Sequence, residues 1–423
     1  MRIRLAGATR ATFQSLRVRN FRLFFAGQLV SQVGNWLTMI AETLLVLELT
    51  HSGLAVGVLA ACQFAPVLVL GAWAGLVADR SDKRRLLVIV QFVAMAQSGV
   101  LAALAFSGRP PILAIDAVAL IGGCALAFDN PARRAFVVEM VSDDDVNNAV
   151  SLNSALMTSA RIVGPALAGL LVTVAGYGWC FTLDAVSYLA VLAAFFKMNP
   201  AELRTPPVAT RAKAQVRAGL RYVRTVPDLW IPLVMMAVVG TLAFNFQVVL
   251  TLFVTRTFHG SIGTFTILFS VTAVGSLMGA LYSARRRRVA VHDVIIASGG
   301  FGVAMLVLAA SPNLGIAFPI GLAVGWTSIA FMTASTAIVQ LRADPAMRGR
   351  VLALQAIVFL GSTPIGGPLL GAICDAYGAR AGLVVGGVAA LGAAGFGSLA
   401  MRRNRTRRLE VAGTTPPADL QVA

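Results

Sequence analysis

The sequence predicts an all-α polytopic membrane protein with twelve transmembrane helices in two six-helix halves. Three observations support this prediction. Of the 423 residues 57% are apolar and 13% are charged, and the mean hydropathy is +0.79. A soluble domain is about 25% charged and needs those charges on its surface. Long apolar segments recur along the whole chain, and the second half of the sequence repeats motifs of the first.

A helix that crosses a membrane needs roughly 20 predominantly apolar residues. This criterion finds six segments in the first half of the chain, at 21–49, 54–78, 85–107, 110–129, 150–176 and 178–197. It finds six more in the second half, at 229–257, 261–283, 290–311, 314–340, 351–376 and 379–401. The first segment is too long for a cleaved signal peptide and lacks a small-residue cleavage site.

Polar segments divide the chain into regions. These regions are a cytoplasmic segment at 1–20, a six-helix half at 21–197, a linker at 198–228, a second half at 229–401 and a disordered tail at 402–423. The linker predicts a basic amphipathic helix on the inner membrane surface. Its apolar residues recur at helical spacing among arginines, at Val216, Leu220 and Val223 with Arg217, Arg221 and Arg224. The linker either only connects the halves or senses lipid.

The basic residues set the predicted orientation. The chain carries 35 Lys and Arg against 18 Asp and Glu, a net charge of +17. Most of the basic residues fall between alternate spans, as at 80–85 and 285–288, or in the linker and the termini. Cytoplasmic loops of membrane proteins carry this excess. The pattern predicts a multi-pass protein of the inner (plasma) membrane with both termini cytoplasmic, and it explains the charge without a nucleic-acid partner.

No catalytic or metal-binding pattern is found. Cys62, Cys124, Cys180 and Cys374 lie in apolar segments without Cys or His spacing for a metal, so we expect buried free thiols. The chain has no GxxxxGK[ST] nucleotide motif and no assembly of Ser, His and Asp. The sequence therefore predicts no enzyme, no catalytic residue, no metal and no cofactor.

An internal repeat relates the two halves at an offset of about 200 residues. The GxxxG motif that begins at Gly71 recurs at Gly275, and Tyr177-Gly178 recurs as Tyr377-Gly378. Two parallel six-helix repeats are typical of transporters whose substrate site lies between the halves, near the middle of the membrane.

Three motifs resemble those of the major facilitator superfamily. Residues 75–85, GLVADRSDKRR, resemble its loop motif G-x-x-x-D-R-x-G-R-R, with Asp82 in place of the usual glycine. Residues 161–169, RIVGPALAG, are similar to the antiporter motif of drug exporters. Residues 48–53, 129–133 and 148–153 resemble the enterobactin-exporter and macrolide-efflux branch. The resemblance covers 15–402 and implies the major facilitator fold.

Two departures from the superfamily pattern concern proton coupling. The second-half copy of the loop motif, at 279–285, lacks the aspartate, and span four lacks the arginine motif of proton-coupled members.

The loop motif is the first candidate site, formed by Gly75, Asp79, Arg80, Arg84 and Arg85. A carboxylate at a helix end can accept charge-assisted hydrogen bonds and face the positive N-terminus of another helix. The resemblance implies that Asp79 does this with span eleven, near Arg350, in one transporter state. Otherwise Asp79 and its arginines only set topology and bind lipid phosphate.

The antiporter-like motif is the second candidate site. Gly164 and Gly169 allow close helix contact, and Pro165 permits a bend. The functional interpretation is a tight interface that bends during exchange. The alternative is ordinary small-residue packing.

A polar stripe marks the predicted cavity. Gln28, Gln32, Asn35 and Glu42 fall on one face of the first span at about 100° per residue. Because an unpaired charge inside the membrane is costly, Glu42 is a candidate to bind and release a proton.

Arg161 in span five needs a partner, which is Glu42, Asp116 or an anionic substrate. Asn245 and Trp326 are candidate lining residues from the second half, and Asp184 is expected near the outer surface.

Together these patterns predict a monomeric exporter that uses inward proton movement to expel a lipophilic or amphipathic small molecule, such as a drug, a macrolide-like compound or a siderophore. Its partners are then that small molecule, protons and membrane lipids. A metabolite importer and a non-transporting scaffold or lipid-handling protein are the alternatives. So few polar residues argue against a sugar, whose site would need many buried hydrogen-bonding groups.

Overall fold

The computed structural model describes residues 13–204, 215–284, 286 and 289–413. Every regular element in these ranges is a helix. Twelve helical segments in them are long and apolar enough to cross a membrane, as the sequence predicts. The chain is therefore a multi-pass membrane protein.

The first half contains six long helices, which follow a short turn of 3₁₀ helix at Gln14–Arg17. They are α2 (Arg19–Thr50), α3 (Gly53–Arg80), α4 (Lys83–Phe106), α5 (Ile112–Glu139), α6 (Val146–Ala175) and α7 (Tyr177–Lys197). Asp82 explains the departure from the superfamily motif, because its carboxylate caps α4 by accepting the backbone N–H of Arg85 at 3.1 Å.

The linker contains the short helix α8 (Gln215–Thr225), which the second half follows. The second half contains α9 (Pro227–Leu242), α10 (Phe246–Leu252), a π-helical turn (Phe253–Thr257), α11 (Ile262–Ala284), α12 (Val291–Ala309), α13 (Leu314–Arg342), α14 (Pro345–Leu360), α15 (Thr363–Tyr377) and α16 (Ala379–Gly413). Two of the predicted spans, 229–257 and 351–376, are therefore each divided into shorter helices.

Side chains replace the missing backbone bonds at both breaks. Asn245 donates from its amide nitrogen to the carbonyl of Thr241 at 2.8 Å, between α9 and α10. Ser362 donates to the carbonyl of Phe359 at 2.6 Å, just before Pro364. Inside a membrane each backbone polar group needs such a partner, so these residues make the breaks tolerable.

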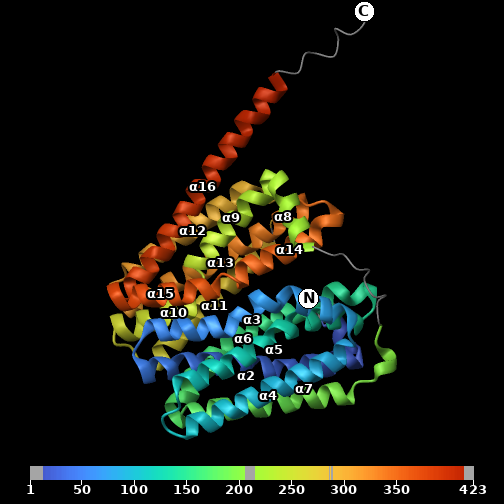
Figure 1. The fold of residues 1–423 in the computed structure, drawn as a ribbon, viewed down its shortest axis with the longest axis vertical. Coiled ribbons are helices and arrows are strands. Elements are labelled where there is room, and N and C mark those ends of the chain that lie inside the picture. Colours follow the sequence, from blue (N-terminus) through green and yellow to red (C-terminus); the bar gives the residue numbers. More distant parts are fainter. Residues whose placement is uncertain (1–12, 205–214, 285, 287–288, 414–423) are drawn as a thin grey trace, which may run out of the picture.

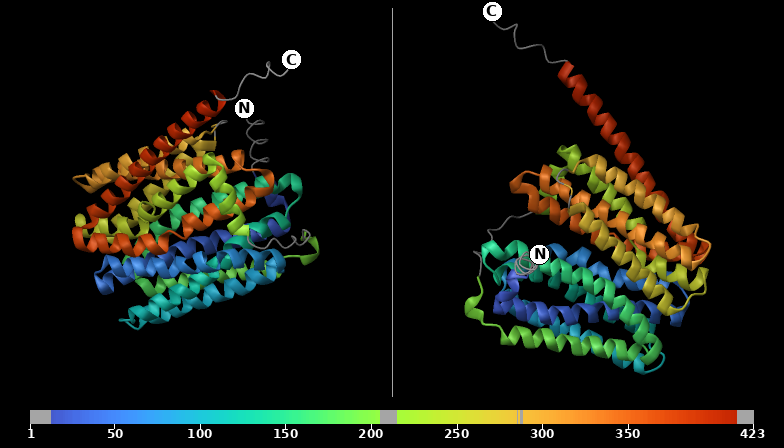
Figure 2. Two further views of the ribbon diagram at one scale, coloured as in Figure 1. Left: turned by 45° about the horizontal axis from the view of Figure 1, so that its top comes forward. Right: turned by 180° about the vertical axis from the view of Figure 1, so that it is seen from behind.

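The two halves form separate bundles that converge at one end (Figure 1). We call that end the distal end, which carries the loops at His51 and Gly378. The opposite end, with Arg80, α8 and the start of α14, is called the basic end. The rotated views in Figure 2 show the same arrangement, with α16 extending beyond the bundle.

Glycine contacts show where the halves meet. A Cβ atom added to Gly371 of α15 would lie 2.1 Å from the carbonyl oxygen of Gly53, and one added to Gly57 of α3 would lie 2.3 Å from that of Gly367. Nearer the basic end, a Cβ on Gly71 or Gly75 would meet nothing within 4 Å. The halves are thus in close contact distally, whereas an added Cβ at these two positions of α3 would enter open space.

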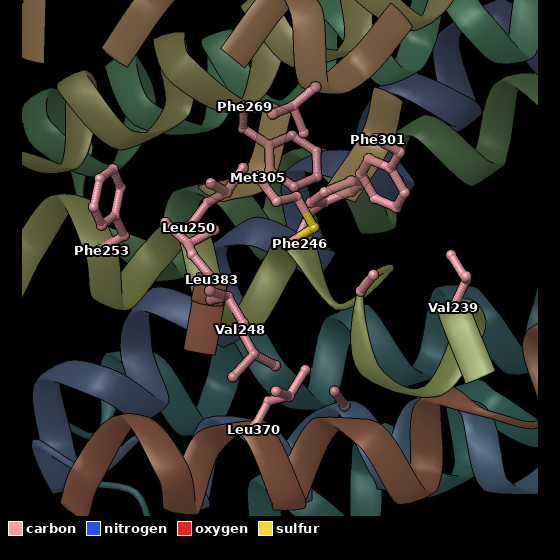
Figure 3. Packing of buried hydrophobic residues seen from close by; sticks show 14 of the residues in the cluster. Val239, Phe246, Val248, Leu250, Phe253, Phe269, Phe301, Met305, Leu370 and Leu383 are labelled. Carbon is pink, nitrogen blue, oxygen red and sulfur yellow. The ribbon is translucent and has the colours of Figure 1, made fainter. Parts of the chain in front are cut away.

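A dense apolar core packs the helices of the second half together. Phe246 and Leu250 of α10 pack with Phe301 and Met305 of α12 (Figure 3), and all four are at most 4% exposed. Such close packing resists gradual deformation.

The linker helix differs from its prediction. Val223 of α8 is fully buried, and a Cβ on Gly219 would lie 3.4 Å from Arg350 of α14. The hydroxyl of Tyr222 also accepts the backbone N–H of Asp344 at 2.9 Å. Helix α8 therefore packs against the second half instead of lying only on the membrane surface. The side chains of Val216 and Arg217 are outside the described residues.

The predicted disordered tail is helical through Gly413, because α16 continues without interruption beyond residue 402. Residues 402–412 contain neither glycine nor proline and are rich in arginine, which is a good helix former. The tail residues after Gly413 are outside the described part of the chain.

Candidate functional site: a polar cavity in the first half

A cavity of about 440 Å³ lies against the first half and is lined by all six of its long helices. Its size suits a drug-sized molecule. Its lining is mixed, with apolar residues such as Phe64 and Val67 beside polar and charged ones. The sequence predicted a site between the halves. Among the described residues, however, Leu360 is the second-half contribution to the lining.

The polar stripe of α2 faces this cavity. Gln32, Asn35 and Glu42 line it. Gln28 lies one turn from Gln32 and accepts its amide N–H at 3.1 Å. The predicted helical spacing therefore does bring these side chains together.

Glu42 is buried, with 1% of its surface exposed, and its carboxyl group is held by neutral amides. Gln63 of α3 donates to Oε2 at 2.5 Å, and Gln97 of α4 donates to Oε1 at 3.4 Å. No basic side chain among the described residues forms an ion pair with Glu42. A neutral amide donor favours the charged form of a carboxyl group less strongly than a fixed cation would.

Asp184 of α7, which the sequence placed near the outer surface, also lines the cavity and is 1% exposed. Its Oδ2 accepts hydrogen bonds from the hydroxyls of Thr38 and Ser98, each at 2.7 Å. A single aspartate in an apolar span does not reveal this, because its partners come from α2 and α4.

A buried ion pair was missed by sequence reasoning. Arg133 and Asp129, both on α5, lie 2.9 Å apart, and Gln91 of α4 donates to Asp129 at 3.0 Å. All three residues line the cavity. The i,i+4 spacing is the signal that could have identified the pair. The charges instead led the predicted span to end at 129, although α5 continues to Glu139.

Arg161 lines the same cavity but pairs with neither predicted acidic residue. Its guanidinium lies 5.9 Å from the ring centre of Trp36. Asp116, the other predicted partner, is outside the cavity lining, and its Oδ1 is buried without a hydrogen-bond partner among the described residues.

The two second-half candidates lie elsewhere. Asn245 supports the break between α9 and α10, as described above. Trp326 packs against Tyr282 with ring centres 5.4 Å apart. Gln247 of α10, a further candidate from the sequence, also lies outside the cavity lining, and it donates to the hydroxyl of Thr43 at 2.5 Å across the two halves.

The loop motif is separated from its expected partner in this structure. Asp79 and Arg80 are exposed, and Asp79 makes no hydrogen bond or ion pair with any described residue. Arg84 donates to the carbonyl of Phe195 at 2.9 Å, and Arg85 lies 3.4 Å from Asp82. The expected contact of Asp79 near Arg350 is thus absent from this conformation.

At the distal end a different aspartate joins the halves. Asp375 of α15 accepts the backbone N–H groups of Gly53 at 2.7 Å and Leu54 at 2.9 Å, and the hydroxyl of Ser52 at 2.9 Å. Arg256 pairs with the same carboxylate at 2.6 Å and also donates to the carbonyl of His51. We call these residues the distal latch. It places a carboxylate on the positive N-terminus of α3.

The antiporter-like motif packs α6 against two helices. A Cβ on Gly164 would lie 2.4 Å from Cβ of Trp36 on α2, and one on Gly169 would lie 2.1 Å from the hydroxyl oxygen of Thr266 on α11. The hydroxyl of Ser270 on α11 donates to the carbonyl of Ile162 at 2.8 Å. The glycines therefore permit one contact within the first half and one between halves.

Substitution of Gly164 by alanine is expected to destabilise the protein by about 1–3 kcal/mol, because the new methyl group overlaps Cβ of Trp36. The matched control is Gly99→Ala on α4, where an added Cβ meets nothing within 4 Å. The control should be neutral or slightly stabilising. Thermal unfolding in detergent measures both. If the two substitutions change the unfolding temperature equally, the close contact between Gly164 and Trp36 does not limit stability.

The cysteines are free thiols, with Cys180 and Cys374 buried and Cys62 and Cys124 half-buried. Within the described ranges, no group of three or more His, Cys, Asp or Glu side chains could hold a metal ion.

Twelve membrane helices in two bundles, with a polar cavity inside the first bundle, are the architecture of a membrane transporter. Residues 10–420 match the model of the family described as transmembrane secretion effector. The chain belongs to this family, which is of the major facilitator type. It is a transporter and not an enzyme.

Characterised relatives cover most of the chain. It is 24% identical to the staphyloferrin A transporter of Staphylococcus aureus, over 84% of this chain and 90% of the relative. It is 24% identical to macrolide efflux protein A of Streptococcus pyogenes, over 82% of this chain and 87% of the relative. It is 23% identical to an enterobactin exporter of Shigella flexneri, over 90% of this chain and 89% of the relative.

A solved structure shares the fold. It is a bacterial homologue of the human lysosomal transporter Spinster in an inward-facing, unoccupied conformation. The TM-score is 0.73 at 15% identity, over 90% of this chain and 96% of the other.

Proposed function

We propose that this chain is a proton-driven exporter that expels an amphipathic small molecule by alternating access. The observation that carries the proposal is Glu42, a buried carboxyl group in the cavity that is held only by the amides of Gln63 and Gln97. The named efflux and siderophore transporters among the relatives support export over import.

The proposed orientation places the basic end in the cytoplasm of a cell whose inner membrane the chain crosses. The loop that carries Arg80, Arg84 and Arg85 lies there, together with the exposed Arg221 and Arg224 of α8. Cytoplasmic loops carry such an excess of basic residues. The structure then represents a conformation that faces the cytoplasm. A single chain supplies the whole cavity, so we propose that the monomer is the working unit.

During alternating access, a contact between the halves at the distal end would be replaced by a contact between them at the basic end. In the present conformation the distal latch holds α15 on α3, while Asp79 is free of described partners. When the cavity faces outwards, the latch breaks and Asp79 approaches the N-terminus of α14 near Arg350. Each state thus has its own carboxylate at a helix N-terminus, and the balance between them sets the equilibrium.

Glu42 would link this movement to protons. Cargo enters from the cytoplasm when the carboxyl group of Glu42 is already charged, or its entry makes Glu42 release a proton to the cytoplasm. After the halves rock, cargo leaves and a proton from outside binds Glu42. A membrane potential of 100 mV supplies about 2.3 kcal/mol for each elementary charge that returns.

Everted membrane vesicles that contain the protein test the proposal. The cargo panel has three naphthalene compounds of one shape: 2-naphthoate (anionic), 2-naphthamide (neutral) and 2-naphthylmethylammonium (cationic). We expect energised vesicles to accumulate at least one of them, and an uncoupler to collapse that accumulation. Accumulation of none, beyond vesicles without the protein, contradicts export of simple amphiphiles. Accumulation that resists the uncoupler contradicts proton coupling.

A further inference from the structure

We propose that Arg161 binds an anionic group of the cargo, so that the cavity selects amphipathic organic anions. This inference rests on the proposed function, since it names the class of molecule that the exporter carries. The anion would be a carboxylate attached to an apolar or aromatic body.

The first argument is that Arg161 has no anion of its own. Its Nε is buried without a hydrogen-bond partner among the described residues, and it forms no ion pair with them. A guanidinium inside a membrane protein is costly unless it is paired. This unpaired cation in the lining of the cavity marks a place for a ligand anion.

The second argument is that every acidic residue of the cavity is already engaged elsewhere. Glu42 accepts from Gln63 and Gln97, and Asp184 accepts from Thr38, Ser98 and Ser187. Asp129 neutralises the other cavity arginine, Arg133, at 2.9 Å. The two cavity arginines therefore differ, because Arg133 has its counter-ion and Arg161 does not.

The third argument is that Arg161 is held in place beside apolar surface. Trp36 lies against its guanidinium, and Gly164, one turn further along α6, lets Trp36 pack this closely. Trp36 also contacts Phe269 of α11, with ring centres 6.1 Å apart. An aromatic face next to a planar guanidinium suits a ligand with a ring and a carboxylate, which can accept two parallel N–H bonds.

Binding of the three naphthalene compounds to the purified protein tests the inference. The protein is placed in phosphatidylcholine nanodiscs, which offer no net anionic lipid, and affinities are measured by calorimetry. We expect wild type to bind 2-naphthoate about 10-fold more tightly than 2-naphthamide, as a charge-assisted bond to a desolvated guanidinium implies. Arg161→Gln should remove this preference, and Arg161→Lys should keep part of it.

The control variant is Arg22→Gln, which removes one positive charge from an exposed position on α2. It should retain the full preference for 2-naphthoate. Thermal unfolding gives an independent readout. Because Arg161 is an unpaired cation whose Nε is buried, Arg161→Gln should unfold at the same or a higher temperature than wild type. A purely structural arginine would instead show a clear loss.

Equal affinity of wild type for 2-naphthoate and 2-naphthamide would overturn the inference, as would a preference that survives Arg161→Gln. These results are separate from those of the vesicle experiment. Uncoupler-sensitive accumulation without anion preference leaves export standing and removes only the role of Arg161. Anion preference without accumulation keeps the binding site and removes the exporter.

Discussion

Glu42→Gln is expected to abolish uphill export while the protein still exchanges cargo. Glutamine keeps the shape and the hydrogen bonds to Gln63 and Gln97 but cannot bind and release a proton. A potential of 100 mV can sustain a concentration ratio of about 50 for each elementary charge. In everted vesicles this ratio should fall to about 1 for the variant.

Counterflow separates loss of coupling from loss of folding. Exchange of labelled for unlabelled cargo across the membrane needs no net proton movement, so Glu42→Gln should retain it. Glu202→Gln is the control, because Glu202 is exposed in the segment that follows α7. Uphill accumulation by Glu42→Gln at the wild-type level would place the coupling group elsewhere in the cavity, with Asp184 as the next residue to test.

Asp375→Asn is expected to shift the protein towards the outward-facing conformation. The substitution removes the ion pair with Arg256 and weakens the bonds to Gly53 and Leu54 at the N-terminus of α3. The carboxylate is partly exposed, so we expect a loss of about 1–2 kcal/mol from the distally closed state. That corresponds to a shift of about 5- to 30-fold in the ratio of the two conformations.

Distances between spin labels measure this shift. Labels at Gly108 and Pro312, in exposed distal loops of different halves, are introduced after the four native cysteines are replaced. The long-distance population should grow in Asp375→Asn. Asp228→Asn is the control, because Asp228 pairs with Arg342 within the second half, at 3.9 Å. Unchanged distal distances in Asp375→Asn would mean that glycine packing alone holds the distal end closed.

The fold follows from local properties that a sequence displays directly. Each span is a long apolar segment, and the polar stripe of α2 appears because residues at helical spacing share a face. The antiporter-like glycines are likewise visible, and Gly164 does meet Trp36.

Other features depend on contacts between distant segments. Asp375 is a single carboxylate near a helix end, and its importance arises only when α3 lies beside α15. The helix breaks at Asn245 and Ser362 replace one or two backbone bonds, which hydropathy averaged over 20 residues does not register. The sequence indicates that Arg161 needs a partner. Only the packed structure of the cavity shows that Arg161 pairs with neither Glu42 nor Asp116.

Proton movement linked to cargo movement is the central claim, and proteoliposomes test it most directly. The purified protein is reconstituted with a pH-sensitive dye inside, and the naphthalene compound that the vesicles accumulate is added outside without any proton gradient. We expect the cargo gradient to drive protons in the opposite direction in wild type and not in Glu42→Gln. Cargo entry without any proton movement in wild type would contradict the account.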